Sequence, residues 1–133
     1  MKLDYKFIKE ILLTMEEYDK HNIDSYELWE KIGVIDSKHC IDKGLLDKFL
    51  GHIKVLDDNC CIECSNNNFG VVPTSGGYLT ANVTFRLTAQ GYEFLDVLKN
   101  YTAFNKIKDF AISNAIDIGK QIIVQLATGA FHG

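Results

Sequence analysis

Residues 84–99 constrain the fold more than any other stretch, because a short strand pattern runs directly into a helix pattern. The stretch reads Thr-Phe-Arg-Leu-Thr-Ala-Gln-Gly-Tyr-Glu-Phe-Leu-Asp-Val-Leu-Lys. Apolar and polar residues alternate over 83–87, as in a strand with one buried face. Thr88 is a good N-cap, since its hydroxyl can accept from a free N–H of the first helical turn. We therefore predict a strand at 83–87 and a helix at 89–99.

The junction between this strand and helix has further features of a fixed turn. Leu87 before the cap and Tyr92 one turn later are spaced to form a hydrophobic staple. Tyr92, Leu95 and Leu98 then recur at helical spacing and predict the buried face of the helix. A strand that ends in Arg-Leu-Thr-x-x-Gly and enters an amphipathic helix is typical of the closing segment of a winged-helix domain.

Composition limits the class of protein. The 133 residues suggest one domain, and 47% hydrophobic residues are enough to build a core. No apolar run reaches the roughly 18 to 20 residues that a membrane span needs. The first four residues, Met-Lys-Leu-Asp, lead straight into a charged helix, so we expect no signal peptide and a location in the cytoplasm of a bacterial cell.

Periodicity predicts the remaining elements. Asp4 is placed to cap the first helix, Asp24 with Glu27 resembles a capping box before the second, and Gly33 suits the end of the second. Residues 66–82 form a long loop that has room for a short strand at 69–72. The expected helices are 5–20, 25–32, 42–57, 89–99, 103–113 and 117–128, and the expected strands are 60–65 and 83–87.

The order helix, helix, helix, strand, long loop, strand, helix is that of a winged helix. We therefore predict an α+β fold, mainly helical, in which a small antiparallel β-wing accompanies the helices. The prediction divides the chain into a winged-helix domain over 1–100, with its wing loop at 66–82, and a helical extension over 101–133. That extension serves either dimerisation or docking on the domain.

Three stretches resemble the DUF2513 family of small bacterial and phage proteins, with the related YjcQ-like proteins. These are the opening Met-Lys-Leu-Asp-Tyr-Lys-Phe-Ile-Lys-Glu-Ile-Leu-Leu, residues 49–56 and residues 86–96. The third, Arg-Leu-Thr-Ala-Gln-Gly-Tyr-Glu-Phe-Leu-Asp, is the most distinctive. The chain departs from the family after the third helix, where Asp57-Asp58-Asn59 replaces an apolar turn, and in its longer wing. The resemblance implies the fold and a phage or mobile-element origin, and it supplies no reaction.

The cysteines and histidines do not form a strong metal pattern. Cys61-Ile-Glu-Cys64 is formally C-x-x-C, and Cys40, His39 and His52 are the other candidate ligands. Residues three apart in a strand point to opposite faces, so we expect Cys60 and Cys64 to pack beside Ile62 as small apolar residues. The histidines are expected in solvent, with His52 on the outer face of the third helix; they are His21, His39, His52 and His132.

Motifs for catalysis are missing from the sequence. Gly76-Gly77 lacks the Lys-Ser/Thr of a phosphate-binding loop, and no serine lies in a nucleophile elbow. We therefore expect a protein that is not an enzyme and needs no cofactor and no small-molecule substrate.

DNA binding is one of two functional hypotheses. In a winged helix the third helix enters the major groove and the wing contacts the backbone. Aspartates interleave with the basic residues of this helix, and the chain carries a net charge of −4. The wing loop has no charged residue, whereas wings that follow phosphates use Lys or Arg. The residues expected to contact DNA are Lys43, Lys48, His52, Lys54 and Arg86.

Binding of a protein partner is the hypothesis that we favour. An uncharged wing offers the aromatic and aliphatic side chains that dominate protein interfaces, unless these side chains pack back on the domain. A phage-encoded acidic protein of this size suits an inhibitor of a host defence or nucleic-acid enzyme. The residues expected to contact the partner are Phe69, Val71, Val72, Tyr78 and Leu79.

The C-terminal segment is expected to self-associate as a twofold homodimer. Residues 121–133 carry no Lys, Arg, Asp or Glu, and the last predicted helix has one apolar face. Twofold pairing is the commonest closed arrangement of identical chains. The residues expected to form the interface are Ile118, Ile122, Ile123 and Leu126.

Overall fold

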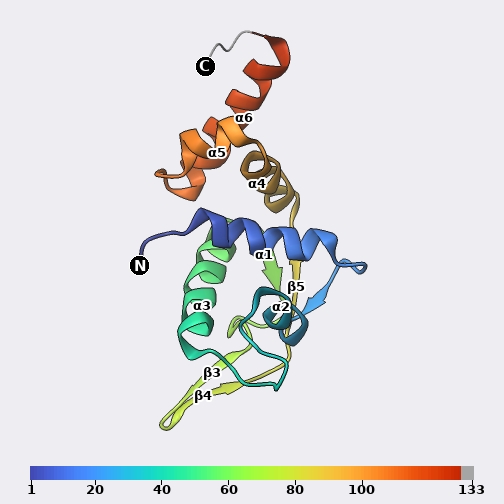
Figure 1. Cartoon of the computed structure of the whole chain (residues 1–133), viewed down its shortest axis with the longest axis vertical. Helices are drawn as coiled ribbons and strands as arrows, with labels where there is room; N and C mark the ends of the chain where they lie inside the picture. Colours follow the sequence, from blue (N-terminus) through green and yellow to red (C-terminus); the bar gives the residue numbers. More distant parts are fainter. Residues whose placement is uncertain (130–133) are drawn as a thin grey trace.

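A computed structural model describes residues 1–129 and contains six helices and five strands in that range (Figure 1). The three helices that precede the wing form the lower body, and the last three helices lie above α1, with the end of α6 pointing away. The elements are α1 Tyr5–Glu17, β1 Ile23–Asp24, α2 Ser25–Ile32, α3 Lys43–Asp58, β2 Ile62–Cys64, β3 Val71–Thr74, β4 Gly77–Thr80, β5 Thr84–Leu87, α4 Ala89–Lys99, α5 Tyr101–Ile107 and α6 Ile112–Thr128.

The main sheet has three antiparallel strands in the order β1-β5-β2. Phe85 of the middle strand lies opposite Ile23 on one side and Cys64 on the other. The sequence did not predict β1, because two residues are too few to show the alternation of a strand. The resulting order, with a strand between the first two helices and a wing between the last two strands of this sheet, is the winged-helix arrangement. The predicted α+β fold class is confirmed.

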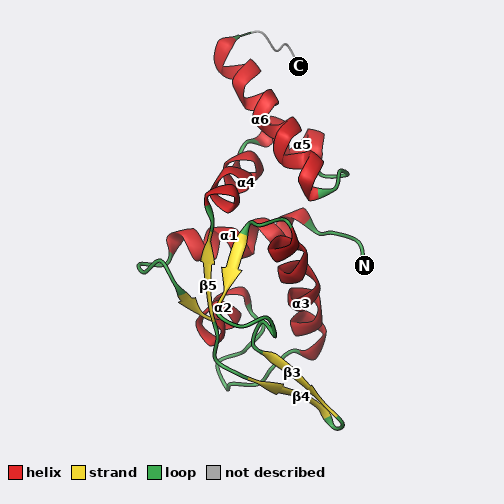
Figure 2. Ribbon diagram, turned by 180° about the vertical axis from the view of Figure 1, so that it is seen from behind, coloured by secondary structure: helices red, strands yellow, loops and turns green. Residues whose placement is uncertain are grey.

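The wing is a separate hairpin of β3 and β4, which projects from the lower end of the molecule (Figure 2). The prediction placed one short strand at 69–72, whereas the structure has two strands, at 71–74 and 77–80. Gly77 has a φ of 128°, a left-handed value that glycine adopts at little cost, and it follows the turn between the strands. The long loop of the prediction is therefore mostly ordered hairpin.

A row of aromatic rings forms the centre of the core. Trp29 of α2, Phe49 of α3 and Phe85 of β5 are fully buried. Their rings meet edge to face, with centroids 6.1 Å apart for Trp29–Phe49 and 5.9 Å apart for Phe49–Phe85. Edge-to-face pairs of this kind contribute about 1 kcal/mol each beyond the burial of their area. These contacts join the second helix, the third helix and the sheet.

The predicted helix caps are partly confirmed. The Asp4 carboxylate accepts from the backbone N–H of Phe7, and the Thr88 hydroxyl oxygen accepts from that of Gly91, both at 3.1 Å. Gly33 ends α2 in the left-handed conformation, with a φ of 86°. The capping box at Asp24 was wrong, because the Asp24 side chain makes no cap hydrogen bond. Instead, Asp24 lies in β1, paired with Thr84 of β5.

The staple between Leu87 and Tyr92 was also wrong. The side chain of Tyr92 is 47% exposed, and Leu87 lies against Gly91 instead. A methyl group at Gly91 would lie 2.0 Å from the carbonyl oxygen of Cys61, so only glycine permits this approach. The buried face of α4 therefore runs through Gly91, Phe94, Leu95, Val97 and Leu98.

The C-terminal helices begin earlier than predicted. Asn100 ends α4, and its side chain then accepts from the N–H of Ala103, so the same residue caps α5. The prediction of helices at 103–113 and 117–128 put the break too late, since the break lies at 108–111. Gly119 of α6 packs directly on Val97 of α4. The buried residues of α5 and α6 join the same hydrophobic cluster as the rest of the core.

The close approach at Gly91 generates a stability prediction. We expect Gly91→Ala to lower the free energy of unfolding by about 3 kcal/mol, because the new methyl group would collide with backbone that cannot easily move. Gly44→Ala is the matched control, because its methyl group would meet no atom closer than 3.5 Å. The control should be neutral or stabilising by about 0.5 kcal/mol through helix propensity. Urea unfolding followed by circular dichroism measures both, and equal effects would contradict the packing argument.

Candidate functional site

The outer face of α3 is where a winged helix would meet DNA, and this face is not basic. Lys43 and Lys54 are exposed on it, but so are Asp47, Asp57 and Asp58. Asp42 caps the helix by accepting from the N–H of Leu45 at 3.0 Å. Two free lysines among these aspartates give a surface that does not attract a phosphate backbone.

His52 does not lie on that outer face, contrary to the prediction. Its side chain is 1% exposed and belongs to the buried face of α3. The Nε2 atom accepts from the backbone N–H of Asp4 at 2.9 Å, and Nδ1 lies 2.8 Å from the carbonyl oxygen of Lys48. Because a carbonyl only accepts, Nδ1 carries the proton and the imidazole is neutral. His52 therefore attaches the start of α1 to α3 and is not available to DNA.

The other two predicted DNA contacts are held in ion pairs. The Nζ of Lys48 donates to the Asp4 carboxylate at 2.7 Å and lies 4.7 Å from the centroid of the Phe7 ring. The hydrogen bond from Lys48 is the main reason that the pKa of Asp4 is lowered. Arg86 pairs with Glu63 on the neighbouring strand, at 2.8 Å. Each charge is thus matched within the protein.

The wing exposes apolar side chains on both of its faces. Val72 lies opposite Leu79 in the hairpin, and Pro73 lies opposite Tyr78. Directly opposed residues share a face, and successive residues alternate, so these two pairs lie on opposite faces. The exposed fractions are 36% for Val72, 54% for Tyr78 and 62% for Leu79.

Two of the predicted partner contacts are buried instead. Phe69 is 6% exposed and Val71 is 3% exposed, and both belong to the core cluster. They lie at the base of the wing, where Gly70 packs so close to the Trp29 ring that a methyl group would lie 3.1 Å from it. These residues fix the wing to the domain and leave Val72, Tyr78 and Leu79 as the candidate contact surface.

Polar groups also hold the base of the wing, and sequence reasoning missed the main one. The buried hydroxyl of Ser25 donates to the carbonyl of Ala81 at 3.2 Å and accepts from the N–H of Val83 at 3.1 Å. The side chains of Asn66 and Asn68 accept from backbone N–H groups two residues further on, as in Asx turns. The amide oxygens of these two asparagines therefore order the backbone at the start of the wing.

The cysteines lie differently from the prediction. Cys60 is exposed in the turn after α3 with a φ of 60°, whereas Cys61 is fully buried. Burial raises the pKa of the Cys61 thiol to about 12, with a smaller contribution from Cys60, so the thiol stays protonated. Cys64 is half-buried in β2, and Cys40 is exposed. Across residues 1–129 no three His, Cys, Asp or Glu side chains group as metal ligands would.

Two of the remaining histidines, His21 and His39, are exposed, and His132 lies outside the described residues.

The residues expected to pair two copies of the chain differ in their exposure. Of these four residues, Ile122 is buried within the molecule and Ile118 and Ile123 are half-buried against the core. Leu126 is 37% exposed. Val124, which the sequence did not single out, is 60% exposed near the end of α6.

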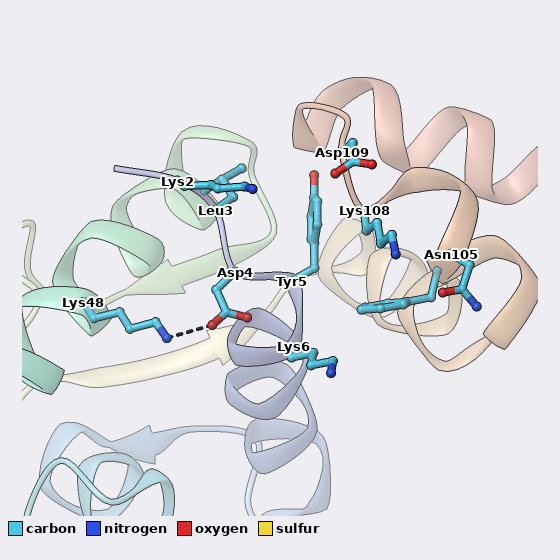
Figure 3. A pocket seen from close by; sticks show the side chains of 10 residues that line it. Lys2, Leu3, Asp4, Tyr5, Lys6, Lys48, Asn105, Lys108 and Asp109 are labelled. Atoms are coloured by element: carbon cyan, nitrogen blue, oxygen red, sulfur yellow. Dashed lines mark hydrogen bonds and ion pairs between the residues drawn. The ribbon is translucent and has the colours of Figure 1, made fainter.

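A cleft of about 550 Å³ lies between the start of α1 and α5 (Figure 3). In this view Lys2, Asp4 and Lys48 lie on one side of the Tyr5 ring, and Lys108, Asn105 and Asp109 lie on the other. Lys6 lies below the ring. The hydroxyl of Tyr5 donates to the carbonyl of Phe110, and burial raises the pKa of Tyr5 to about 12. Sequence reasoning missed this site, although Lys2, Lys6 and Lys9 recur at helical spacing.

The fold defines a winged-helix protein with a hairpin wing and three helices after the sheet. Residues 2–117 match the family model described as hypothetical protein (DUF2513), and the chain belongs to this family. The comparison with curated proteins found no match, and neither did the comparison with solved structures. Within residues 1–129, none of the helices has the length and apolar character required to cross a membrane.

The two hydrogen bonds of His52 generate a second stability prediction. We expect His52→Ala to lower the free energy of unfolding by about 3 kcal/mol, because it leaves the partly buried N–H of Asp4 without this partner and opens a cavity. His21→Ala, at an exposed position, is the control and should change stability by less than about 0.5 kcal/mol. Thermal unfolding of both variants tests this. A His52 variant as stable as the control would show that the residue is not a structural link.

Proposed function

We propose that this protein acts by binding another protein through its wing, without catalysis. The observation that carries the proposal is the uncharged hairpin with exposed Val72, Tyr78 and Leu79. Apolar and aromatic side chains at the centre of a contact contribute most of the affinity of protein interfaces. An exposed hairpin of this composition, attached to the domain at its base, has the character of a recognition element.

The backbone of the wing supports the same function. β4 pairs only with β3 among residues 1–129, so its other edge presents N–H and C=O groups that an extended peptide can pair with. Pro73 lies in β3 and has no N–H, which makes the β3 edge less suitable. The partner is therefore expected to contact the β4 side of the hairpin, where Tyr78 and Leu79 lie.

Sequence-specific DNA binding through α3 is the alternative. Its support is the winged-helix arrangement itself, in which the third helix reads the major groove. Of its five proposed contacts, His52 is buried, and Lys48 and Arg86 are paired with acidic residues. Lys43 and Lys54 remain, together with a wing that has no charge. Useful duplex affinity needs several neutralised phosphates, and two lysines supply too few. We therefore favour a protein partner over DNA.

We propose a phage or mobile-element origin, a cytoplasmic location and a role as an inhibitor of a host defence or nucleic-acid enzyme. The supports are the family resemblance, the acidic balance of the chain and the small size. We also propose a homodimer formed through the end of α6.

The wing is tested by capture of partners from the native host with the tagged full chain. We expect a protein that is enriched by the natural sequence and reduced at least about tenfold by Tyr78→Ser/Leu79→Ser, since two central contacts are lost. Tyr92→Ser is the control, because Tyr92 is an exposed tyrosine on α4 away from the wing. It should retain the same protein.

A mobility-shift assay at about 50 mM salt is run beside the capture experiment, because phosphate contacts are strongest at low salt. Sequence-selective duplex binding that is lost in Lys43→Ala/Lys54→Ala, with no wing-dependent protein, would replace our proposal by the DNA alternative. Circular dichroism of each variant shows that the fold is retained.

The homodimer is tested by light scattering at micromolar concentration. We expect the mass of two chains for the natural sequence and of one chain for Val124→Asp/Leu126→Asp, because buried carboxylates oppose association. Ser113→Asp/Asn114→Asp places the same charges at exposed positions at the start of α6 and should leave the dimer intact. A single-chain mass for the natural sequence would rule out the homodimer.

A further inference from the structure

Two adjoining clefts form a surface rich in lysine between the start of α1 and α5, on the opposite side of α1 from the wing (Figure 1). The first has a volume of about 550 Å³ and the second about 480 Å³. Lys6, Phe104 and Asn105 line both clefts, so the two are continuous. We use the name lysine surface for Lys2, Lys6, Lys9 and Lys108 together with Tyr101.

The four lysines of this surface lack acidic partners. Lys48, at the edge of the first cleft, pairs with Asp4, and Lys99, at the edge of the second, pairs with Glu16 at 2.5 Å. No ion pair within residues 1–129 includes Lys2, Lys6, Lys9 or Lys108. Asp109 is the one remaining carboxylate along both clefts. The surface is therefore locally positive, although the chain carries a net charge of −4.

Gathering these lysines costs the protein stability when nothing is bound. Like charges one helical turn apart repel each other, and Lys6 and Lys9 are three residues apart at the start of α1. Lys108 extends from the end of α5 toward the same opening (Figure 3). Because none of these four lysines forms an ion pair with a carboxylate of residues 1–129, an anionic ligand would gain affinity by relieving the repulsion.

An exposed aromatic ring lies beside the lysines. Tyr101 is the first residue of α5, and its side chain is 83% exposed. Phe104, three residues later, is half-buried and lines both clefts, so it adds an apolar surface beside the lysines. A positive groove with an exposed aromatic ring is the combination that holds single-stranded nucleic acid, since the lysines follow phosphates and the ring stacks on a base.

We propose that the lysine surface binds a single-stranded nucleic acid, with Lys2, Lys6, Lys9 and Lys108 on successive phosphates and Tyr101 stacked on a base. This activity is separate from the wing and from α3, and it does not depend on the function proposed above. Arginine is absent from both clefts. The paired N–H groups of arginine suit a carboxylate, whereas lysine acts as a point charge, so the composition favours a flexible phosphate chain over an acidic peptide.

A single strand fits this surface better than a duplex does. The positive region is limited to the two clefts, and the neighbouring α3 surface carries Asp47, Asp57 and Asp58. A rigid duplex would extend over such acidic surroundings, whereas a short flexible strand can stay within the clefts.

Fluorescence anisotropy with 5′-fluorescein-labelled dT12 and rU12 tests the proposal on the full chain. Four phosphate contacts predict affinity about fifty-fold weaker at 200 mM than at 50 mM KCl. Lys6→Glu/Lys108→Glu should weaken binding at least about tenfold at 50 mM KCl. Tyr101→Ala should weaken it about tenfold at both salt concentrations, because stacking does not depend on counterions.

The matched control is Lys43→Glu/Lys54→Glu, which makes the same change of charge on α3 and should alter affinity less than about threefold. Lys6→Gln/Lys108→Gln is a second variant with less repulsion, and circular dichroism checks the fold of each. The absence of saturable binding of the single strands at 50 mM KCl would overturn the proposal. Binding of a 12-residue polyglutamate peptide that is tighter than that of the single strands would do the same. So would tighter binding of a duplex of equal length that is lost in the α3 control. Unchanged affinity of Tyr101→Ala would also overturn it.

Discussion

Pairing of β5 on both of its edges is the interaction on which the rest of the structure depends. The strand lies between β1 and β2, and its Phe85 is fully buried. β1 leads directly into α2, and β2 follows α3, so each pairing fixes the position of one helix. At the end of β5, the N–H of Thr88 donates to the carbonyl of Cys61 at 3.1 Å, and its hydroxyl donates to that of Cys60 at 2.5 Å. The same residue caps α4, so the fourth helix is positioned from the sheet as well.

The wing shows how a small domain can hold an uncharged element out in solvent. Only the base of the hairpin is packed, where Phe69 and Val71 enter the core and Ser25 satisfies the backbone on the return strand. The hydroxyl of Tyr26 adds a contact to the Thr80 hydroxyl at 2.9 Å. Because these contacts end at the base, the exposed side chains further out do little for the stability of the domain. Their apolar character is the feature on which the proposed binding of a protein partner rests.

Periodic patterns in the sequence were enough to predict the helices and the winged-helix order. Rules based on residue type and local spacing failed for single side chains whose burial depends on tertiary packing. His52 lies three residues after Phe49 and four before Leu56, which is the spacing of the buried stripe, but its polar character indicated solvent. Tyr92 was expected inside from its spacing to Leu87 and Leu95, whereas the missing side chain of Gly91 is what lets α4 approach Cys61, just before β2.

The candidate sites were predictable to different degrees. The wing could be located from its lack of charge, and Val72, Tyr78 and Leu79 were correctly expected to be accessible. The lysine surface could not be predicted, because it joins residues at the start of the chain with residues near 108, and only the tertiary packing of α4, α5 and α6 above α1 brings them together.

The hydrogen bond from Tyr5 to Phe110 joins residues that are 105 positions apart in the chain. Contacts of such sequence separation carry a large loop-closure entropy, so they form late in folding. α4, α5 and α6 can pack on one another through contacts that are near in sequence, and this group of helices then docks on α1. If unfolding follows the reverse order, these helices separate from α1 early. The two clefts exist only while the helices are packed together. Amide hydrogen exchange at the α5–α6 turn therefore reports on how often Tyr101 and Lys108 are separated from Lys2, Lys6 and Lys9.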